Sequence, residues 1–304
     1  MPKYPARSYG LIRLTSPSVN LYTRGIALCV ATMFVFATQD GITKFLSTAY
    51  PVPQILMVRY VFFILFAIWL TRRVGVLAAL RSGSPRLQIL RSLVLVTEIG
   101  MFALTVRYLP LAYTHAILAS TPLIVTALSV PMLGEKVGLR RWVAVGIGFV
   151  GMLIILRPGI GVFQPASLLA LLTGGMYAVY IVLTRMVSRY DGSATTVLYT
   201  SLVGGAVMLA IGPFYWTPPD ATGWALLLTL ACTGAGGHFL FIKALEAAPA
   251  SVLQPYGFTV LVWATIVGYL VFGDVPDGAT LAGAAIIVAS GLYAFYRERK
   301  RADQ

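Results

Sequence analysis

The sequence predicts an all-α integral membrane protein with ten transmembrane helices, arranged as two inverted repeats of five helices. Of the 304 residues 58% are apolar and only 11% are charged, whereas about a quarter are charged in a soluble domain. Apolar stretches of the length that crosses a bilayer recur along the chain. The second half of the chain also matches the first at helix-spaced positions. A soluble enzyme, a secreted disulfide-rich protein and a disordered chain are excluded by this composition.

The predicted spans are separated by residues that form turns. Examples are the breaks at Pro51, at Pro158 and at Pro218. The spans themselves are residues 25–46, 53–71, 87–106, 111–133, 140–156, 166–187, 194–213, 223–245, 249–272 and 279–296. Residues 1–24 are then an N-terminal tail, 25–156 the first repeat, 166–296 the second repeat and 297–304 a basic C-terminal tail.

The positive charges lie in alternate loops, and this sets the expected orientation. The net charge is +13. Loops that follow odd-numbered spans contain only Arg107 and Arg157 as cations, and they contain Asp220, Asp274 and Asp277. The tails and the other loops hold nearly all remaining lysines and arginines. The positive-inside rule therefore predicts a multi-pass protein of the inner (plasma) membrane with both termini in the cytoplasm. No aromatic platform accompanies the basic clusters, so nucleic-acid binding is not predicted.

An internal repeat relates the two halves. At an offset of 141, the first span falls on the sixth, and at 139 the fourth falls on the ninth. The matched residues are Thr32, Phe36, Gln39, Thr43 and Lys44 with Thr173, Tyr177, Tyr180, Thr184 and Arg185, and Pro110, His115, Ser120, Gly134 and Glu135 with Pro249, Gln254, Thr259, Gly273 and Asp274. Each half holds an odd number of spans, so the halves have opposite orientations. Inverted repeats are typical of transporters that work by alternating access.

Each half ends its fourth helix with a similar motif, Leu133-Gly134-Glu135 and Phe272-Gly273-Asp274. With ten helices, the chain from about residue 25 to 296 resembles the drug/metabolite transporter superfamily in its EamA-type branch. Within that branch it looks most like the YddG-type amino-acid exporters of bacterial inner membranes. The resemblance implies export of amino acids, aromatic and apolar ones among them. The chain departs from the pattern at Asp274, where an aspartate replaces glutamate, and at the early Pro255.

Ionisable groups inside the spans are the first candidates for a substrate site, because they are costly in hydrocarbon. Glu98 lies in the middle of the third span, and the repeat sets it against Gly237, beside His238. We interpret Glu98 and His238 as a substrate-binding or proton-carrying pair. The alternatives are a structural hydrogen bond or an ion pair between Glu98 and Arg91, seven residues away on the same helix face.

Other polar groups in the spans have weaker claims. Asp40 and Lys44 are spaced i, i+4, which predicts a structural ion pair within one helix. Arg59 lies close enough to a span end to reach the lipid headgroups. His115 and Gln254 correspond across the repeat, and either function or simple packing fits them.

Aromatic residues supply a second candidate wall. Tyr177 and Tyr180 lie well inside the sixth span, while Tyr256 and Trp263 are seven residues apart on the ninth. They fit either a pocket for a small amphipathic solute or the aromatic belt at a membrane surface. The predicted substrate-binding residues are Gln39, Glu98, His115, Tyr177, Tyr180, His238, Gln254, Tyr256 and Trp263.

Enzymatic activity is not predicted. Residues 146–151 fit the pattern GxGxxG, but they lie inside an apolar span, where glycines let helices or two protomers pack closely. A homodimer is therefore left open. No HExxH or GxSxG motif is present, and we expect no catalytic residue, metal or cofactor. The expected partners are a small-molecule solute and the lipid bilayer. The alternatives are a broad metabolite or drug exporter of the same fold and, less favoured, a membrane enzyme or a lipid scramblase.

Overall fold

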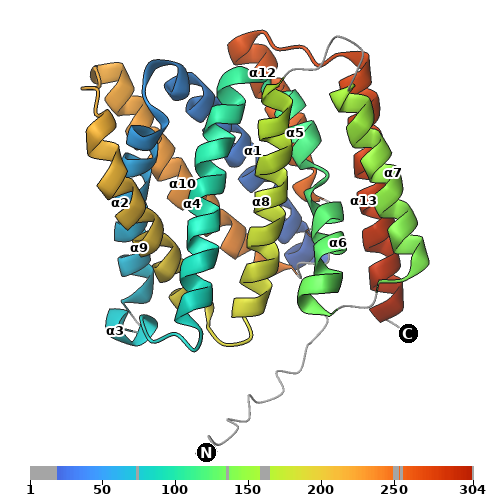
Figure 1. The fold of residues 1–304 in the computed structure, drawn as a ribbon, viewed down its shortest axis with the longest axis horizontal. Helices are drawn as coiled ribbons and strands as arrows, with labels where there is room; N and C mark the ends of the chain where they lie inside the picture. The colour runs from blue at the N-terminus through green and yellow to red at the C-terminus, as the bar shows by residue number, and fades with distance from the viewer. Residues whose placement is uncertain are drawn as a thin grey trace, which may run out of the picture.

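The computed structural model describes residues 19–72, 75–134, 137–157, 165–248, 253 and 256–302. Regular structure in this part of the chain is helical, and the helices lie side by side in one bundle (Figure 1). They are α1 (Val19–Ala49), α2 (Val52–Thr71), α3 (Val76–Ala79), α4 (Pro85–Tyr108), α5 (Leu111–Leu118), α6 (Thr121–Leu133), α7 (Leu139–Leu156), α8 (Ala166–Val187), α9 (Ser193–Ile211), the 3-10 helix η1 (Gly212–Tyr215), α10 (Ala221–Ala247), α12 (Thr259–Phe272) and α13 (Gly278–Ala302).

The all-helical membrane fold is confirmed in this part of the chain. Seven helices are long and apolar enough to cross a membrane, namely Thr23–Ala49, Val52–Thr71, Pro85–Tyr108, Leu111–Leu133, Ala166–Val187, Ser193–Tyr215 and Ala221–Phe241. Three shorter apolar helices accompany them, namely Trp142–Leu156, Thr259–Phe272 and Gly278–Ala294. Ten spans therefore remain a prediction. Part of the expected ninth span, residues 249–252, lies outside the described residues.

The expected fourth span is broken into α5 and α6. Pro122 has no N–H, so the carbonyl of Leu118 lacks its helical donor. The turn tightens instead, with the amide of Ser120 donating to the carbonyl of Ile117 at 3.0 Å. In the second half α12 begins at Thr259, within one residue of the position that corresponds to the start of α6. The break between α5 and α6 thus places a helix end inside the bundle, and α12 begins near the corresponding position of the second half.

The ends of α6 and α12 have the same geometry. Gly134 and Gly273 follow these helices with φ of 70° and 69°, the left-handed region that favours glycine. Each amide donates back into its helix, Gly134 to Val130 at 3.1 Å and Gly273 to Tyr269 at 3.0 Å. The positions are those that the offset of 139 residues relates, so the geometry supports the predicted correspondence.

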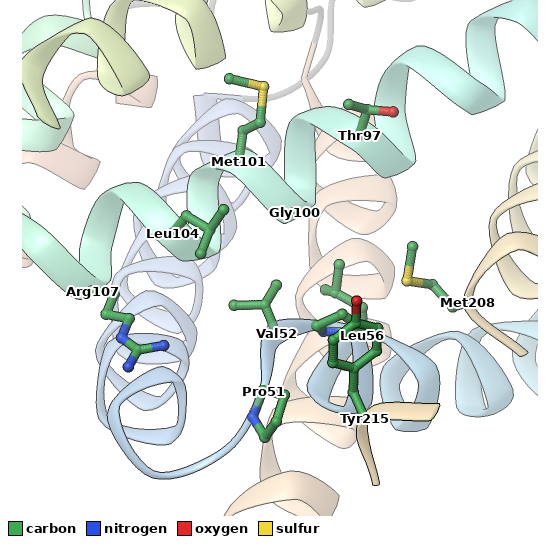
Figure 2. Close-up of a pocket in the computed structure, with 11 residues that line it drawn as sticks. Pro51, Val52, Leu56, Thr97, Gly100, Met101, Leu104, Arg107, Met208 and Tyr215 are labelled. Carbon is green, nitrogen blue, oxygen red and sulfur yellow. The ribbon is translucent and has the colours of Figure 1, made fainter. Parts of the chain in front are cut away.

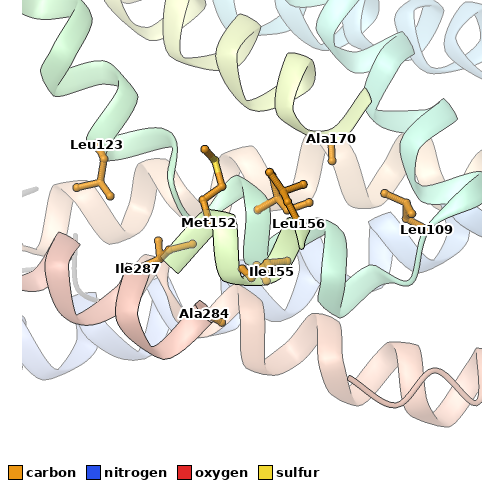
Figure 3. Close-up of a cluster of buried hydrophobic side chains, with 10 residues drawn as sticks. Leu109, Leu123, Met152, Ile155, Leu156, Ala170, Ala284 and Ile287 are labelled. Carbon is orange, nitrogen blue, oxygen red and sulfur yellow. The ribbon is translucent and has the colours of Figure 1, made fainter. Parts of the chain in front are cut away.

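The helices α7 and α13 are packing helices, joined through glycine. A Cβ added to Gly283 would lie 2.5 Å from the carbonyl oxygen of Gly151, and one added to Gly151 would lie 2.9 Å from that of Gly283. Ile155 and Ile287 lie beside this contact in a buried apolar cluster that also reaches α5, α6 and α8 (Figure 3). The packing role predicted for the glycine-rich segment is therefore confirmed.

Asp191, after α8, clamps the loop that precedes α4. Its carboxylate accepts hydrogen bonds from the hydroxyl of Ser82 at 2.5 Å, the amide of Gly83 at 2.7 Å and the side chain of Gln88 at 2.9 Å. Partial burial alone would raise the pKa of Asp191, but these three donors outweigh it and hold the pKa below its usual value.

We expect Asp191→Asn to destabilise the purified protein by roughly 1–3 kcal/mol at neutral pH, because hydrogen bonds to the ionised carboxylate are lost. The folded pKa is depressed, so the stabilisation is present above about pH 3.9 and is lost as pH falls through the folded pKa. Thermal unfolding of the detergent-solubilised protein measures the change. Ser193→Ala, at an exposed position on α9, is the control. Equal melting temperatures for Asp191→Asn and wild type would contradict this role.

Candidate functional site

Polar side chains from four helices come close to one another in the interior of the bundle, and two of them, Gln39 and Arg59, lie beside Gly234 at the midpoint of α10. We name this set the central cluster: Gln39 and Asp40 of α1, Arg59 of α2, Glu98 of α4, and Tyr177 and Tyr180 of α8. Glu98 lies ten residues before the end of α4, or about 15 Å along the helix. The cluster therefore lies at the level where an inverted-repeat transporter holds its solute.

Glu98 is buried, with 8% of the residue exposed. Among the described residues no hydrogen bond or ion pair is assigned to its carboxylate. Arg59 and Asp40 are close enough to act on it electrostatically. A carboxylate at this depth needs a cation or a proton, so Glu98 is poised to bind one.

Arg59 points into the bundle and not toward the lipid headgroups, which corrects the sequence interpretation. A Cβ added to Gly234 would lie 3.8 Å from Arg59 Nε and 3.3 Å from Gln39 Oε1. Arg59 and Gln39 therefore lie beside the same point of α10. The packing of α2 against α10 turns this face of α2 inward. Gln39 Oε1 is buried without a hydrogen-bond partner, so it can accept from a solute.

Tyr177 and Tyr180 form a stacked pair, with ring centroids 5.9 Å apart and planes 19° apart. Tyr177 is 41% exposed. One turn earlier on the same face, Thr173 lies with its hydroxyl 3.3 Å from that of Thr105 on α4. That face is turned toward α4, so the exposed part of Tyr177 faces the inside of the bundle. That these tyrosines line a solute pocket stays a prediction.

Arg91 is fully buried beside the tyrosine pair. Its Nη2 donates to the hydroxyl of Thr200 at 2.5 Å and to the carbonyl of Thr196 at 2.9 Å, which ties α4 to α9. Its Cζ lies 5.3 Å from the centre of the Tyr180 ring. An Arg91–Glu98 ion pair is therefore not formed, because the guanidinium is held by α9 instead.

Asp40 and Lys44 do not pair with each other, so that prediction is wrong. Asp40 Oδ2 lies 3.0 Å from His115 Nε2 on α5. Lys44 Nζ lies 2.5 Å from Asp274 Oδ2 and donates to the carbonyl of Leu109 at 3.3 Å. Each group finds its partner on another segment of the fold, because a buried charge is unfavourable without a nearby partner.

The remaining predicted residues are not all brought together. Trp263 packs edge-on to Phe34, with centroids 5.2 Å apart, and its Nε1 is buried without a partner. Tyr256 and Trp263 belong to an apolar cluster around Cys29, apart from the tyrosine pair. The side chain of His238 lies outside the described part of the structure, and so does Gln254.

Two members of the central cluster, Asp40 and Arg59, were not predicted as site residues. Both were visible as ionisable residues within apolar spans, which is the signal that identified Glu98. They were not counted as site residues, because Arg59 was expected to reach the lipid headgroups and Asp40 was expected to pair with Lys44 within one helix.

A cavity of about 400 Å³ lies between α2, α4 and α9 (Figure 2), and Glu98 is not among the residues that line it. Its lining is apolar, with Leu56, Met101, Leu104 and Met208 among the residues, and Arg107 at one edge. It brings few polar groups together, so it does not fit an amphipathic solute as well as the central cluster does. Among the described residues no group of His, Cys, Asp and Glu side chains could hold a metal ion.

Comparisons with known proteins place the chain among transporters. The sequence model of the EamA-like transporter family matches residues 23–157 and again residues 164–296. The riboflavin transporter of Vibrio cholerae is 31% identical over 88% of this chain and 91% of its own. The S-adenosylmethionine uptake transporter of Rickettsia prowazekii is 25% identical over 93% of this chain and 96% of its own.

Two further matches agree with these. The pseudopaline exporter CntI of Pseudomonas aeruginosa is 24% identical over 90% of this chain and 96% of its own. A protein of known crystal structure shares the fold with a TM-score of 0.59 at 18% identity, covering 92% of this chain and 98% of its own. A pair of matches to one family that together span nearly the whole chain indicates a transporter and not an enzyme. The chain belongs to the EamA-like transporter family.

Proposed function

We propose that this protein carries a small solute with an amino-acid group and an aromatic or apolar part across the inner membrane, by alternating access. The observation that carries the proposal is the stacked Tyr177–Tyr180 pair, exposed toward the inside of the bundle beside Glu98 and Arg59. Glu98 would bind the solute's ammonium and Arg59 its carboxylate. The tyrosine rings would stack on an aromatic or apolar side chain.

Helix pairing supports two inverted five-helix repeats. Suppose that α1, α2, α4, α5–α6 and α7 of the first half correspond, in that order, to α8, α9, α10, α12 and α13 of the second half. The contact of α1 with α10 then has an equivalent, which is the contact of α8 with α4. The contacts of α2 with α9 and of α7 with α13 map onto themselves. Figure 1 shows α1 and α8 running in opposite directions. The two family matches also fall near the proposed halves.

A difference between the halves supports alternating access. The helices α1 and α4 pack against each other, whereas the corresponding α8 and α10 are not among the principal contacts of the described residues. Under an inverted repeat these two contacts lie at opposite ends of the bundle. Closure at the end near Lys44 without matching closure at the other end is what one state of an alternating-access carrier requires.

The family's diversity favours a second candidate, a broad metabolite exporter of the same fold. The relatives above are named for riboflavin, S-adenosylmethionine and pseudopaline, so the shared fold does not fix the solute. S-adenosylmethionine is itself an amino acid with a heteroaromatic part, and riboflavin has an aromatic ring system. Both share chemical features with the solute class proposed here.

We further propose that both termini are cytoplasmic and that net transport is outward. The asymmetry of loop cations supports the orientation, with Asp220 and Asp277 on the outer side. One relative is named for uptake and another for export, so membership of the family does not set the direction of net transport. That direction depends on how this chain couples transport to a gradient.

Counterflow in proteoliposomes tests the solute class. We expect vesicles loaded with unlabelled tryptophan to accumulate labelled tryptophan transiently, with competition from other aromatic amino acids. Riboflavin and S-adenosylmethionine, added as competitors, separate the broad from the narrow carrier. Vesicles without protein are the control. If no amino acid moves while an unrelated metabolite does, the amino-acid proposal fails and the transporter family remains.

A further inference from the structure

We propose that Arg91 is a second anion-binding subsite, and that it holds a carboxylate on the part of the solute that lies farthest from the amino-acid group. The solute is then an amphoteric compound with a second acid beyond its aromatic or apolar part. The subsite itself stands on the contacts of Arg91. The form of the solute rests on the function proposed above.

The guanidinium of Arg91 has more hydrogen-bond donors than acceptors. It carries five N–H groups, two of them on Nη2. Nη2 donates to the side chain of Gln88 at 3.3 Å, the carbonyl of Thr196 at 2.9 Å and the hydroxyl of Thr200 at 2.5 Å. Nε and Nη1, which carry the other three N–H groups, are buried and have no hydrogen-bond partner among the described residues. Buried donors without partners are rare in proteins, so this side of the guanidinium lacks an acceptor that the fold does not supply.

The positive charge of Arg91 also lacks a direct counterion. Among the described residues no acidic side chain forms an ion pair with it. Asp191 is connected to it through Gln88, whose amide donates to the carboxylate and whose carbonyl accepts from Nη2. Glu98 is seven residues away, about 10 Å along α4. Water bound at Nε and Nη1 would accept the hydrogen bonds but leave the charge, which is unfavourable inside a membrane. The missing acceptor is therefore expected to be an anion.

Two tyrosines complete the surroundings of this guanidinium. The ring of Tyr180 on α8 has its centre 5.3 Å from Cζ, and the hydroxyl of the same residue is also near. Tyr60 of α2 is 2% exposed, and its hydroxyl has no hydrogen-bond partner among the described residues. Tyr60 and Arg91 are close enough to act on each other electrostatically. A phenol is neutral at physiological pH and can donate, so Tyr60 would add an O–H donor for an anion without balancing its charge.

A glycine on α9 makes room for Tyr60 at this place. A Cβ added to Gly204 would lie 2.7 Å from the hydroxyl oxygen of Tyr60. Gly204 follows Thr200 by four residues, about 6 Å along the helix, and Thr200 accepts from Arg91. The hydroxyl of Tyr60 and the guanidinium of Arg91 therefore lie beside successive turns of the same face of α9.

The stacked tyrosines connect this subsite to the amino-acid end of the proposed site. Tyr180 contacts Arg91, whereas Tyr177 is close enough to Glu98 to act on it electrostatically. A solute with its ammonium at Glu98 and its ring on the tyrosine pair therefore extends toward Arg91. Nε and Nη1 are enclosed in this structure and the ring of Tyr180 lies against the guanidinium, so binding of the acid requires this ring to move aside.

Binding of matched phenylalanine derivatives to the protein in lipid nanodiscs tests the subsite. 4-Carboxyphenylalanine carries the second carboxylate, and 4-carbamoylphenylalanine is its neutral isostere. We expect wild type to bind the acid about 10- to 100-fold more tightly than the amide, because only the acid forms charge-assisted hydrogen bonds with Arg91. Arg91→Gln should bind both equally, and Tyr60→Phe should lower the ratio about threefold. Arg107→Gln, which removes an exposed guanidinium at the other end of α4, should leave the ratio unchanged.

A purely structural role of Arg91 gives a different result. Arg91→Gln would then weaken binding of both derivatives together and keep the wild-type ratio, which would overturn the subsite. Equal binding of acid and amide by wild type would overturn it as well. If Arg91→Gln does not fold, Tyr60→Phe decides, and an unchanged ratio in that variant refutes the proposal.

Benzoate and benzamide, which have no amino-acid group, separate the subsite from the proposed function. In saturation-transfer NMR we expect a stronger signal from benzoate than from benzamide with wild type, and equal signals with Arg91→Gln. If benzoate binds in this way and no phenylalanine derivative does, the amino-acid function fails and the subsite stands. If neither acid depends on Arg91, the subsite is wrong, and tryptophan counterflow still decides the function.

Discussion

Glu98→Gln is expected to lower the initial rate of tryptophan counterflow about 10- to 100-fold. The substitution keeps the shape of the side chain and removes its charge. Charge-assisted hydrogen bonds contribute about 1.5–3 kcal/mol, and each 1.4 kcal/mol is about a factor of ten. The loss should appear in counterflow at saturating and at low tryptophan, because both binding and reorientation of the loaded carrier use this contact.

Thr97→Val is the matched control for this substitution. Thr97 precedes Glu98 on α4 but faces outward, where it lines the apolar cavity of Figure 2, and its hydroxyl bonds within its own helix to Leu93. Transport by this variant should remain close to wild type. A Glu98→Gln protein that is monodisperse and transports at the parent rate would show that the ammonium is bound elsewhere.

The helical fold could be predicted from sequence because its main determinant is local. A lipid-exposed helix must be apolar along its length, so hydropathy shows where each helix runs. The ends of α6 and α12 were also predictable, because Gly134 and Gly273 supply the left-handed backbone that such an end requires. The break between α5 and α6 was missed, because the hydropathy of residues 111–133 continues across it.

The pairing of polar groups could not be predicted in the same way. The i, i+4 spacing of Asp40 and Lys44 predicted a contact that is worth only about 0.2–0.5 kcal/mol on an isolated helix. In the bundle, His115 and Asp274 are stronger partners, because burial penalises any charge left without one. Arg59 was misplaced for a related reason. Its distance from a helix end is a property of the sequence, but the direction it faces is set by packing against α10.

Arg91 shows the same limit. Its spacing from Glu98 allowed an ion pair along α4, yet Gln88, Thr196 and Thr200 hold the guanidinium at the contact with α9. Sequence spacing reports which side chains share a helix face. It does not report which neighbouring helix covers that face, and the chemistry of this site depends on the neighbours.

The ion pair of Lys44 and Asp274 is expected to hold the bundle closed at its end of the molecule. Lys44 on α1 contacts the residue that follows the cap of α12, and it donates to the carbonyl of Leu109 between α4 and α5. The ammonium also lies 4.6 Å from the centre of the Phe272 ring. One side chain thus joins three elements from both halves, at 12% exposure for Lys44 and 19% for Asp274.

Lys44→Met should therefore expose the centre of the bundle from this end. The reporter is Thr105→Cys, in a protein in which Cys29 and Cys232 are replaced, labelled by an impermeant thiol reagent on intact spheroplasts. We expect labelling about tenfold faster than with Lys44 present, from the loss of roughly 1–3 kcal/mol of closing energy. Val275→Cys, at a position that is 72% exposed near Asp274, should be labelled in every background if this end faces outward.

Two comparisons separate the ion pair from a general loosening of the fold. Arg157→Met breaks the Arg157–Asp277 pair, which is more exposed, and should change labelling little because exposed pairs contribute about 0–1 kcal/mol. Reversing the charges, Lys44→Asp with Asp274→Lys, should restore slow labelling because the attraction is rebuilt between the same two positions. If the reversed pair is labelled as fast as Lys44→Met, the charge interaction does not close this end. Closure would then rest on the apolar packing of α1 against α12 and α4.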